Sequence, residues 1–102
     1  MFVNLTRVRL TDQGVVEARI VAEEMERWLR QIEGYEGFLM LVGEGTAVGV
    51  TFWENRDVAE RHRTPRIEFR DKILAIAGVE IEETMEYEVA YARFGPQLTG
   101  LE

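Results

Sequence analysis

The chain has 102 residues, of which 46% are hydrophobic and 30% are charged, and its formal net charge is -7 at pH 7. A chain of this length has room for one hydrophobic core, so we expect one folded domain. Cysteine is absent, which excludes disulfides, thiolate nucleophiles and cysteine-bound metals. The acidic balance argues against a nucleic-acid partner, because phosphate binding needs clustered cations.

Metal and membrane association are also disfavoured. His62 is the single histidine, so a zinc or iron site would need carboxylates for nearly all of its ligands, and we expect no metal. Every apolar run is far shorter than the roughly 20 residues of a membrane span. The N-terminal sequence MFVNLTRVRLTD alternates like a strand, unlike a signal peptide. The sequence therefore predicts a cytoplasmic protein without a membrane partner.

The first predicted element is a strand over residues 2–10, where β-branched and polar residues alternate. Residues 11–14 supply turn and helix-capping side chains. A helix is predicted over residues 15–32, because apolar residues recur every three or four positions, and Gly34 ends it. The apolar stripe of this helix consists of Ala18, Val21, Met25, Trp28, Leu29 and Ile32.

Two strands are predicted next, over residues 38–42 and 48–53, and the Gly-Glu-Gly-Thr sequence at 43–46 is typical of a hairpin turn. Both strands are nearly unbroken apolar runs, which indicates a sheet that is covered on both faces. One layer of helices covers only one face. We therefore expect a second subunit to cover the other.

A second helix is predicted in two pieces, residues 56–63 and 65–77, because proline disfavours helical geometry in the residue before it, here Thr64. Residues 54–57 supply capping side chains and early acids, and Gly78 stops the helix. The predicted apolar stripe is Val58, His62, Pro65, Phe69, Ile73 and Ile76.

The last strand is predicted over residues 79–93, antiparallel to the first, and residues 94–102 form a tail. The expected register places Val3 opposite Ala92, so that arginines of the first strand face glutamates of the last. This register turns Asn4, Tyr87 and Tyr91 toward the helices. The element order is that of an α+β, ferredoxin-like β-α-β-β-α-β fold with a four-stranded antiparallel sheet.

Residues 51–65, TFWENRDVAERHRTP, resemble the antibiotic biosynthesis monooxygenase-like family of the dimeric α+β barrel superfamily. Further matching pieces are the first strand, GFLM at residues 37–40 and EYEV at residues 86–89. The resemblance covers residues 2–93, so we assign residues 1–93 to one domain. It implies a homodimer in which two four-stranded sheets close into a barrel, with a pocket in each subunit between its helices and its sheet.

The resemblance also implies an activity. One branch of the superfamily oxidises phenols or quinols with molecular oxygen, without metal or flavin, so we expect a cofactor-independent monooxygenase for a small aromatic substrate and no cofactor. The alternative is a non-catalytic dimeric domain that binds a small molecule or serves as a stress-related accessory, because fold does not settle function.

Heme degradation is not expected. The asparagine, tryptophan and histidine that the heme-degrading branch uses align with Val8, His62 and Lys72. A looser alignment that uses Asn4 restores one of these three positions.

The candidate catalytic residues are His62, as a base or hydrogen-bond donor, and Arg66, as a partner for a phenolate or carboxylate. Each has a structural alternative: a single structural hydrogen bond for His62, and a surface ion pair with Glu60 or Glu68 for Arg66. Aromatic side chains chiefly supply buried area, so the aromatic candidates have the alternative of core or interface packing. The candidate substrate-binding residues are Asn4, Phe38, Trp53, Phe69, Tyr87 and Tyr91.

Overall fold

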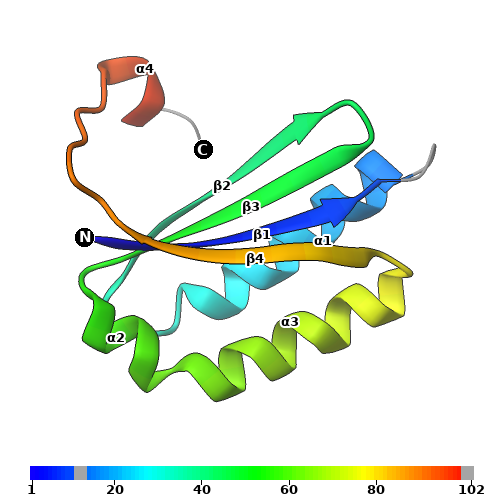
Figure 1. Ribbon diagram of the computed structural model, residues 1–102, viewed down its shortest axis with the longest axis horizontal. Coiled ribbons are helices and arrows are strands. Elements are labelled where there is room, and N and C mark those ends of the chain that lie inside the picture. The colour runs from blue at the N-terminus through cyan, green and yellow to red at the C-terminus, as the bar shows by residue number, and fades with distance from the viewer. Residues whose placement is uncertain (11–13, 100–102) are drawn as a thin grey trace.

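The computed structural model describes residues 1–10 and 14–99, so residues 11–13 of the turn predicted at 11–14 and the end of the tail lie outside it. In chain order the elements are β1 (Phe2–Arg9), α1 (Gly14–Leu29), β2 (Tyr35–Gly43), β3 (Thr46–Trp53), α2 (Arg56–Arg61), α3 (Arg63–Ala77), β4 (Glu80–Glu88) and α4 (Pro96–Thr99). The strands form one antiparallel sheet in the order β2-β3-β1-β4 (Figure 1). The predicted α+β, ferredoxin-like fold is confirmed.

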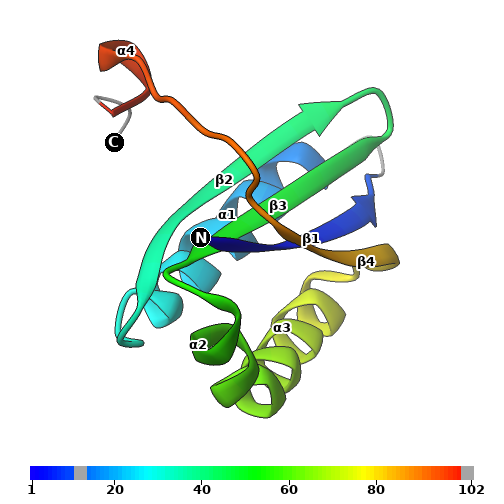
Figure 2. The same cartoon turned by 60° about the vertical axis from the view of Figure 1, so that its left-hand side comes forward.

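The helices α1, α2 and α3 lie on one face of the sheet, called here the helix face (Figures 1 and 2). The opposite face, called here the open face, carries no helix over its centre. After β4 the chain runs across to this side and ends in α4, and Phe94 packs edge-on against Phe52 with a centroid distance of 6.3 Å. The open face is therefore covered by its own chain only at this end.

The core lies between the helix face and the apolar stripe of α1, as the periodicity predicts. Leu29 of α1 and Trp53 of β3 are both completely buried. Gly34 ends the turn after α1 with φ +91°, and a Cβ there would lie 2.5 Å from Val58 Cγ1. Glycine is therefore needed at this position both for its backbone angle and for the close approach of α2.

The helix break falls at His62, two residues before the predicted Thr64. His62 both ends α2 and begins α3, and Pro65 lies in the first turn of α3, where a missing N–H costs no helical hydrogen bond. Arg66 lies one turn after His62, and the buried residues of α3 are Arg66, Ile73 and Leu74. The prediction that Pro65 and Ile76 belong to the buried stripe is wrong, since both are exposed, Ile76 by 78%.

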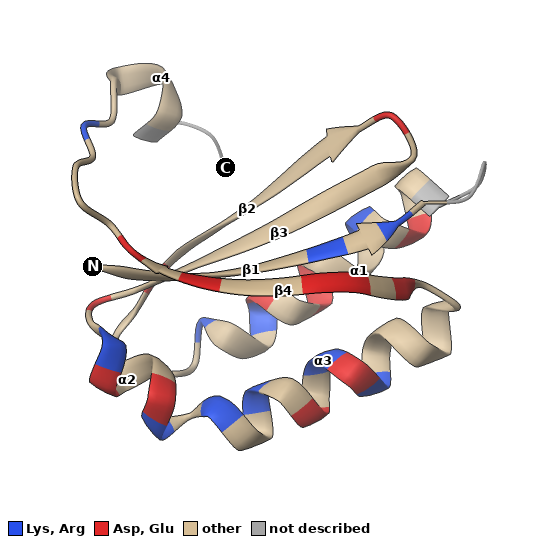
Figure 3. Cartoon of the chain, viewed as in Figure 1, with Lys and Arg blue, Asp and Glu red and all other residues tan. Residues whose placement is uncertain are grey.

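The predicted register between β1 and β4 is also wrong. Val3 lies opposite Tyr87 and Arg7 opposite Glu83, five residues from the expected partners Ala92 and Glu88, and β4 ends at Glu88 rather than at residue 93. An odd shift moves the side chains of residues 83–88 to the other face, whereas the register shift between Arg7 and Val8 keeps Ile81 opposite Val8 on the helix face. Glutamates stand at both even and odd positions of β4, among them Glu82 and Glu83, so charge pairing with β1 does not distinguish the two registers. Figure 3 shows the acidic residues of β4 in red.

Candidate functional site

The helix face carries a buried polar group around Trp53. The sequence alone does not determine on which side of the sheet Trp53 lies. The indole Nε1 donates a hydrogen bond of 2.6 Å to Asn4 Oδ1, and Tyr35 packs edge-on against the indole at 6.3 Å. Asn4 lies opposite Thr51 on β3, and both side chains are buried. The strand alternation of β1 therefore places Asn4 under the helices, as predicted.

Arg66 of α3 covers the same indole. Its guanidinium carbon lies 5.6 Å from the ring centroid of Trp53, a cation–π arrangement, and Nη2 donates to the carbonyl oxygen of Ala59 at 3.4 Å. Arg66 is only 7% exposed. Burial lowers the pKa of this guanidinium, and the carboxylate of Glu86 opposes that effect.

Two donors in this group lack a partner among the described residues. They are Asn4 Nδ2 and Arg66 Nε, both fully buried. Buried polar groups in folded proteins are almost always hydrogen-bonded, and each exception requires a physical reason. A ligand oxygen that accepts hydrogen bonds from these two donor atoms would supply such a reason.

A cavity of about 80 Å³ lies between α1, α3 and the helix face, and Asn4, Trp53 and Arg66 are absent from its lining. Its floor is built from small β3 residues, Ala47 and Gly49, and it reaches Thr51, the strand partner of Asn4. Arg70, one turn beyond Arg66, is the single ionisable side chain among the described lining residues. The other lining residues are Thr6, Val8, Ala18, Val21, Ala22, Met25, Phe38, Met40, Ile73, Leu74 and Val79.

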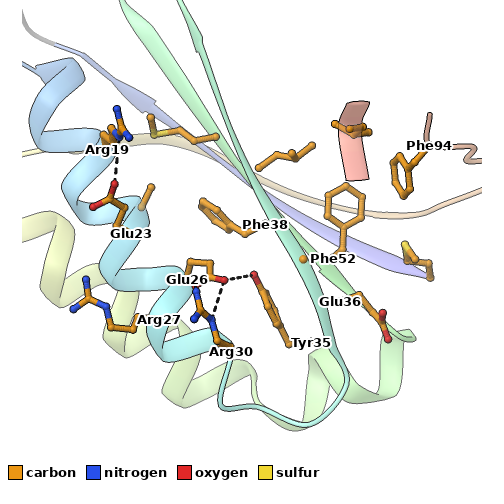
Figure 4. A pocket seen from close by; sticks show the side chains of 16 residues that line it. Arg19, Glu23, Glu26, Arg27, Arg30, Tyr35, Glu36, Phe38, Phe52 and Phe94 are labelled. Atoms are coloured by element: carbon orange, nitrogen blue, oxygen red, sulfur yellow. Dashed lines mark hydrogen bonds and ion pairs between the residues drawn. The ribbon is translucent and has the colours of Figure 1, made fainter. Parts of the chain in front are cut away.

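A second, larger hollow of about 1160 Å³ is an open groove around the free edge of β2 (Figure 4). Phe38 enters it from the helix side and Phe52 from the open face, so the groove does not form one enclosed site. Several of its polar side chains pair with one another: Glu26 accepts from Arg30 at 2.6 Å and from the hydroxyl of Tyr35 at 3.3 Å. Burial and the neighbouring Glu26 raise the pKa of Tyr35 to about 12.

The structure brings together only part of the predicted site. Asn4, Trp53 and Arg66 form the buried polar group, and Phe38 lines the adjoining cavity. Phe69 stacks on Trp28 with ring centroids 4.8 Å apart and packs against the core cluster that contains Trp53.

Three predicted site residues lie elsewhere. His62 is half-buried at the junction of α2 and α3 and is absent from the lining of both hollows. The expectation that Tyr87 and Tyr91 face the helices is wrong: Tyr87 lies on the open face, 54% exposed, and Tyr91 follows the end of β4, 83% exposed. The sequence prediction missed Thr6 and Arg70, of which Thr6 shares the alternation that located Asn4.

The described residues contain no helix that is long and apolar enough to cross a membrane. Within the same residues, no three histidine, aspartate or glutamate side chains gather in a way that could hold a metal ion.

Comparison with solved structures places the fold among the antibiotic biosynthesis monooxygenases. A Deinococcus radiodurans protein assigned to that group superposes with a TM-score of 0.73 at 16% identity, over 92% of this chain and 97% of the other. The ActVA-Orf6 monooxygenase of Streptomyces coelicolor, solved with nanaomycin D, gives 0.71 at 12% identity, over 92% and 91%. The cofactor-independent oxygenase SnoaB of Streptomyces nogalater gives 0.70 at 11% identity, over 89% and 94%.

Sequence comparison adds nothing to this: no protein-family model and no curated protein matches the chain. The resemblance seen in the sequence is thus confirmed at the level of the fold, which is that of the antibiotic biosynthesis monooxygenases.

Proposed function

We propose that this protein is a cofactor-independent monooxygenase that oxidises a small phenol- or quinol-type aromatic molecule on the helix face of its sheet. The observation that carries the proposal is the buried group of Asn4, Trp53 and Arg66, linked through Thr51, the strand partner of Asn4, to an apolar cavity. This group presents two unpartnered donors next to an aromatic wall. The fold is shared with oxygenases of this kind, which supports the assignment.

The chemistry needs little from the protein. A deprotonated phenol or quinol is electron-rich enough to pass electrons to oxygen. At the reacting ring carbon the single C–H bond is replaced by a C=O bond, and the phenolic C–O–H becomes a second C=O. The other oxygen atom of O₂ leaves as water with the hydrogens of that C–H and that O–H, so the substrate loses four electrons and O₂ gains four. The protein must favour the deprotonated substrate and exclude water, for which Arg66, Asn4 and the apolar lining are suited.

The size of the cavity limits how a substrate enters. At about 80 Å³ it is smaller than the roughly 300–1,000 Å³ of typical ligand sites. An aromatic substrate therefore requires side chains to move, and Met25 and Met40 in the lining have the flexible, unbranched chains that permit this. Phe38 stands between the cavity and the edge groove and lines both, so it is the expected gate.

A homodimer is part of the proposal. The open face presents an apolar surface that runs across the strands, with Leu41 54% exposed and Leu39, Val48 and Leu5 partly exposed. Exposed apolar surface of this kind on a small sheet is stabilised by packing against another layer. A second copy placed face to face would supply that layer and complete the α+β barrel.

Oxygen consumption with a panel of anthrone-type and hydroquinone-type compounds tests the activity. We expect substrate-dependent uptake by the wild type and its loss in Ala47→Ile, which fills the cavity floor. Ala75→Ile, on the exposed side of α3, is the matched control and should keep the activity. His62→Ala measures whether the half-buried histidine contributes. Absence of uptake with every compound would contradict the proposal.

The second candidate is a non-catalytic domain that binds a small molecule. The small volume of the cavity and its single ionisable lining residue, Arg70, favour it, because no described carboxylate or histidine there can act as a base. Calorimetric binding of the same compounds without oxygen uptake would identify this function.

A further inference from the structure

We propose that ligands enter the cavity from the free edge of β2, and that Phe38 and Gly49 together determine the size of the ligand that is admitted. The ring of Phe38 closes the entrance, and Gly49 provides the space into which this ring packs. The inference rests on the proposed function for the cavity as the ligand site. It adds the entrance and the two residues that control it.

The cavity and the edge groove meet at three residues that line both, Ala22, Phe38 and Met40. Ala22 has only a methyl group, and the side chain of Met40 is unbranched and flexible, so neither forms a rigid barrier. Phe38 carries the large, rigid side chain of the three, and its ring projects from β2 toward α1 (Figure 4). Displacement of this one half-buried ring therefore joins the groove to the cavity.

The position of Phe38 on an edge strand permits that displacement. Within the described part of the chain β2 pairs with β3 alone, so its other edge is free. Phe38 lies opposite Thr51, which is buried and lines the cavity. The register of the two strands shifts between Tyr35 and Gly37, directly before Phe38. Irregularities of this kind are frequent beside functional sites, where they redirect a side chain.

Gly49 of β3 provides the space for the closed ring. A Cβ at this position would lie 3.3 Å from Cζ of Phe38 and 3.5 Å from Cε2. The first distance is below the optimal carbon–carbon separation of about 3.5–4.0 Å. The φ of Gly49 is not positive, so its backbone does not require glycine, and glycine weakens the interior of a strand. The close approach of the ring is therefore the physical reason for glycine here.

The opposite wall of the cavity is a less favourable entrance. A ligand that entered between α1 and α3 would pass Arg70, whose Nη2 donates to Asp71 Oδ1 at 3.0 Å. It would also displace Ile73 and Leu74, which are buried. The edge of β2 requires the movement of a single half-buried ring, so it is the route that disrupts fewer contacts.

The absence of cysteine from the chain allows a direct test of the entrance. Ala47→Cys places a single thiol on the cavity floor, where Ala47 is 2% exposed. Its thiolate reacts with methyl or benzyl methanethiosulfonate, expels methanesulfinate and forms a mixed disulfide, which mass spectrometry detects. Each rate constant is divided by that of free cysteine with the same reagent. The two reagents then compare a small group with an aromatic one.

In the Ala47→Cys background, Phe38→Ala should speed benzyl labelling about tenfold or more and methyl labelling less, because it removes the closed state. Gly49→Ala should speed benzyl labelling about threefold, the scale expected for a ring pushed off its preferred rotamer. It should not do so when combined with Phe38→Ala. Gly43→Ala is the matched control, since a Cβ there makes an ordinary 3.5 Å contact with Thr46, and it should leave both rates unchanged.

Labelling in low urea separates local opening from unfolding. Movement of one ring exposes little surface, so the rate should not depend on urea, whereas labelling through global unfolding would rise steeply with it. Circular dichroism verifies that each variant folds, and Phe38→Leu serves if Phe38→Ala does not.

Three results would overturn the inference: equal benzyl rates with and without Phe38, an unchanged or slower rate in Gly49→Ala, or a steep urea dependence. A larger acceleration by Arg70→Ala than by Phe38→Ala would also overturn it, because it would place the entrance between α1 and α3. Labelling requires neither turnover nor substrate. The expected labelling without oxygen uptake would overturn the proposed function alone, and uptake without the expected labelling would overturn this inference alone.

Discussion

Trp53 Nε1 donates a 2.6 Å hydrogen bond to Asn4 Oδ1 in the buried interior of the helix face. The two residues are diagonal neighbours, since Asn4 pairs with Thr51 and Trp53 pairs with Phe2. This bond ties β1 to the end of β3 and fixes the Asn4 amide, whose other atom, Nδ2, is buried without a partner among the described residues. It therefore joins the stability of the sheet to the geometry of the site.

Loss of this bond should destabilise the fold measurably. Asn4→Ala leaves the indole N–H buried without an acceptor, and we expect a loss of about 1–3 kcal/mol in the free energy of unfolding, measured with urea. Trp53→Phe removes the donor. Because the residues share one bond, the double variant should lose less than the sum of the single losses. Additivity within about 0.5 kcal/mol would show that the two residues are not coupled.

Gly34 should tolerate substitution less well than Gly45. Both have positive φ, +91° and +71°, but a Cβ at Gly34 would lie 2.5 Å from Val58 Cγ1, whereas Gly45 has open space around it. Gly45→Ala should cost about 1–2 kcal/mol for its backbone conformation alone, and Gly34→Ala clearly more. Thermal unfolding compares them. Val58→Ala introduced into Gly34→Ala should cost less than in the wild type, and an equal cost would contradict the steric account.

The stability of the protein should fall as the pH rises from 10 toward 12, in part because of Tyr35. Burial, and then Glu26, raise the pKa of its hydroxyl from 10.0 to about 12 in the folded chain. Between these values the unfolded tyrosine releases its proton while the folded one keeps it, so rising pH favours unfolding. Tyrosinate absorbance of the wild type minus that of Tyr35→Phe reports this group. Glu26→Gln should lower the pKa of Tyr35, and an unchanged value would show that burial alone sets it.

The register of β1 and β4 can be tested by charge reversal. Arg7 Nη2 lies 2.6 Å from Glu83 Oε2 on the open face. Arg7→Glu should cost up to about 1 kcal/mol, since both side chains are partly exposed, and adding Glu83→Arg should restore it. Glu88→Arg, which the sequence-based register would favour, should not. Recovery with Glu88→Arg would show that the strands pair in the other register.

The proposed dimer predicts a mass twice that of the 11.8 kDa chain by light scattering. Leu5→Glu places a charge in the middle of the apolar open face and should yield monomers, because an unpaired charge in an apolar interface is costly. Ile76→Glu is the matched control, since Ile76 is 78% exposed on α3, and it should leave the mass unchanged. A monomeric wild type at micromolar concentration would contradict the barrel.

Sequence patterns were sufficient for the element order. The stripe of α1 and the two apolar strands around Gly45 are local periodicities, and each was recovered within a few residues. The side of the sheet that Asn4 occupies also followed from alternation along β1. These features depend on neighbouring residues only, so the chain itself encodes them.

Tertiary structure decided what local periodicity leaves undetermined. The register of β4 depends on which of several equivalent glutamates meets Arg7, and a shift by an odd number turned Tyr87 from the helix face to the open face. Packing against the core also decided that Arg66 of α3 is buried while Ile76 is exposed. Long-range packing sets both, because a shift of one residue in strand register turns every side chain of the shifted stretch to the other face without changing the local sequence pattern.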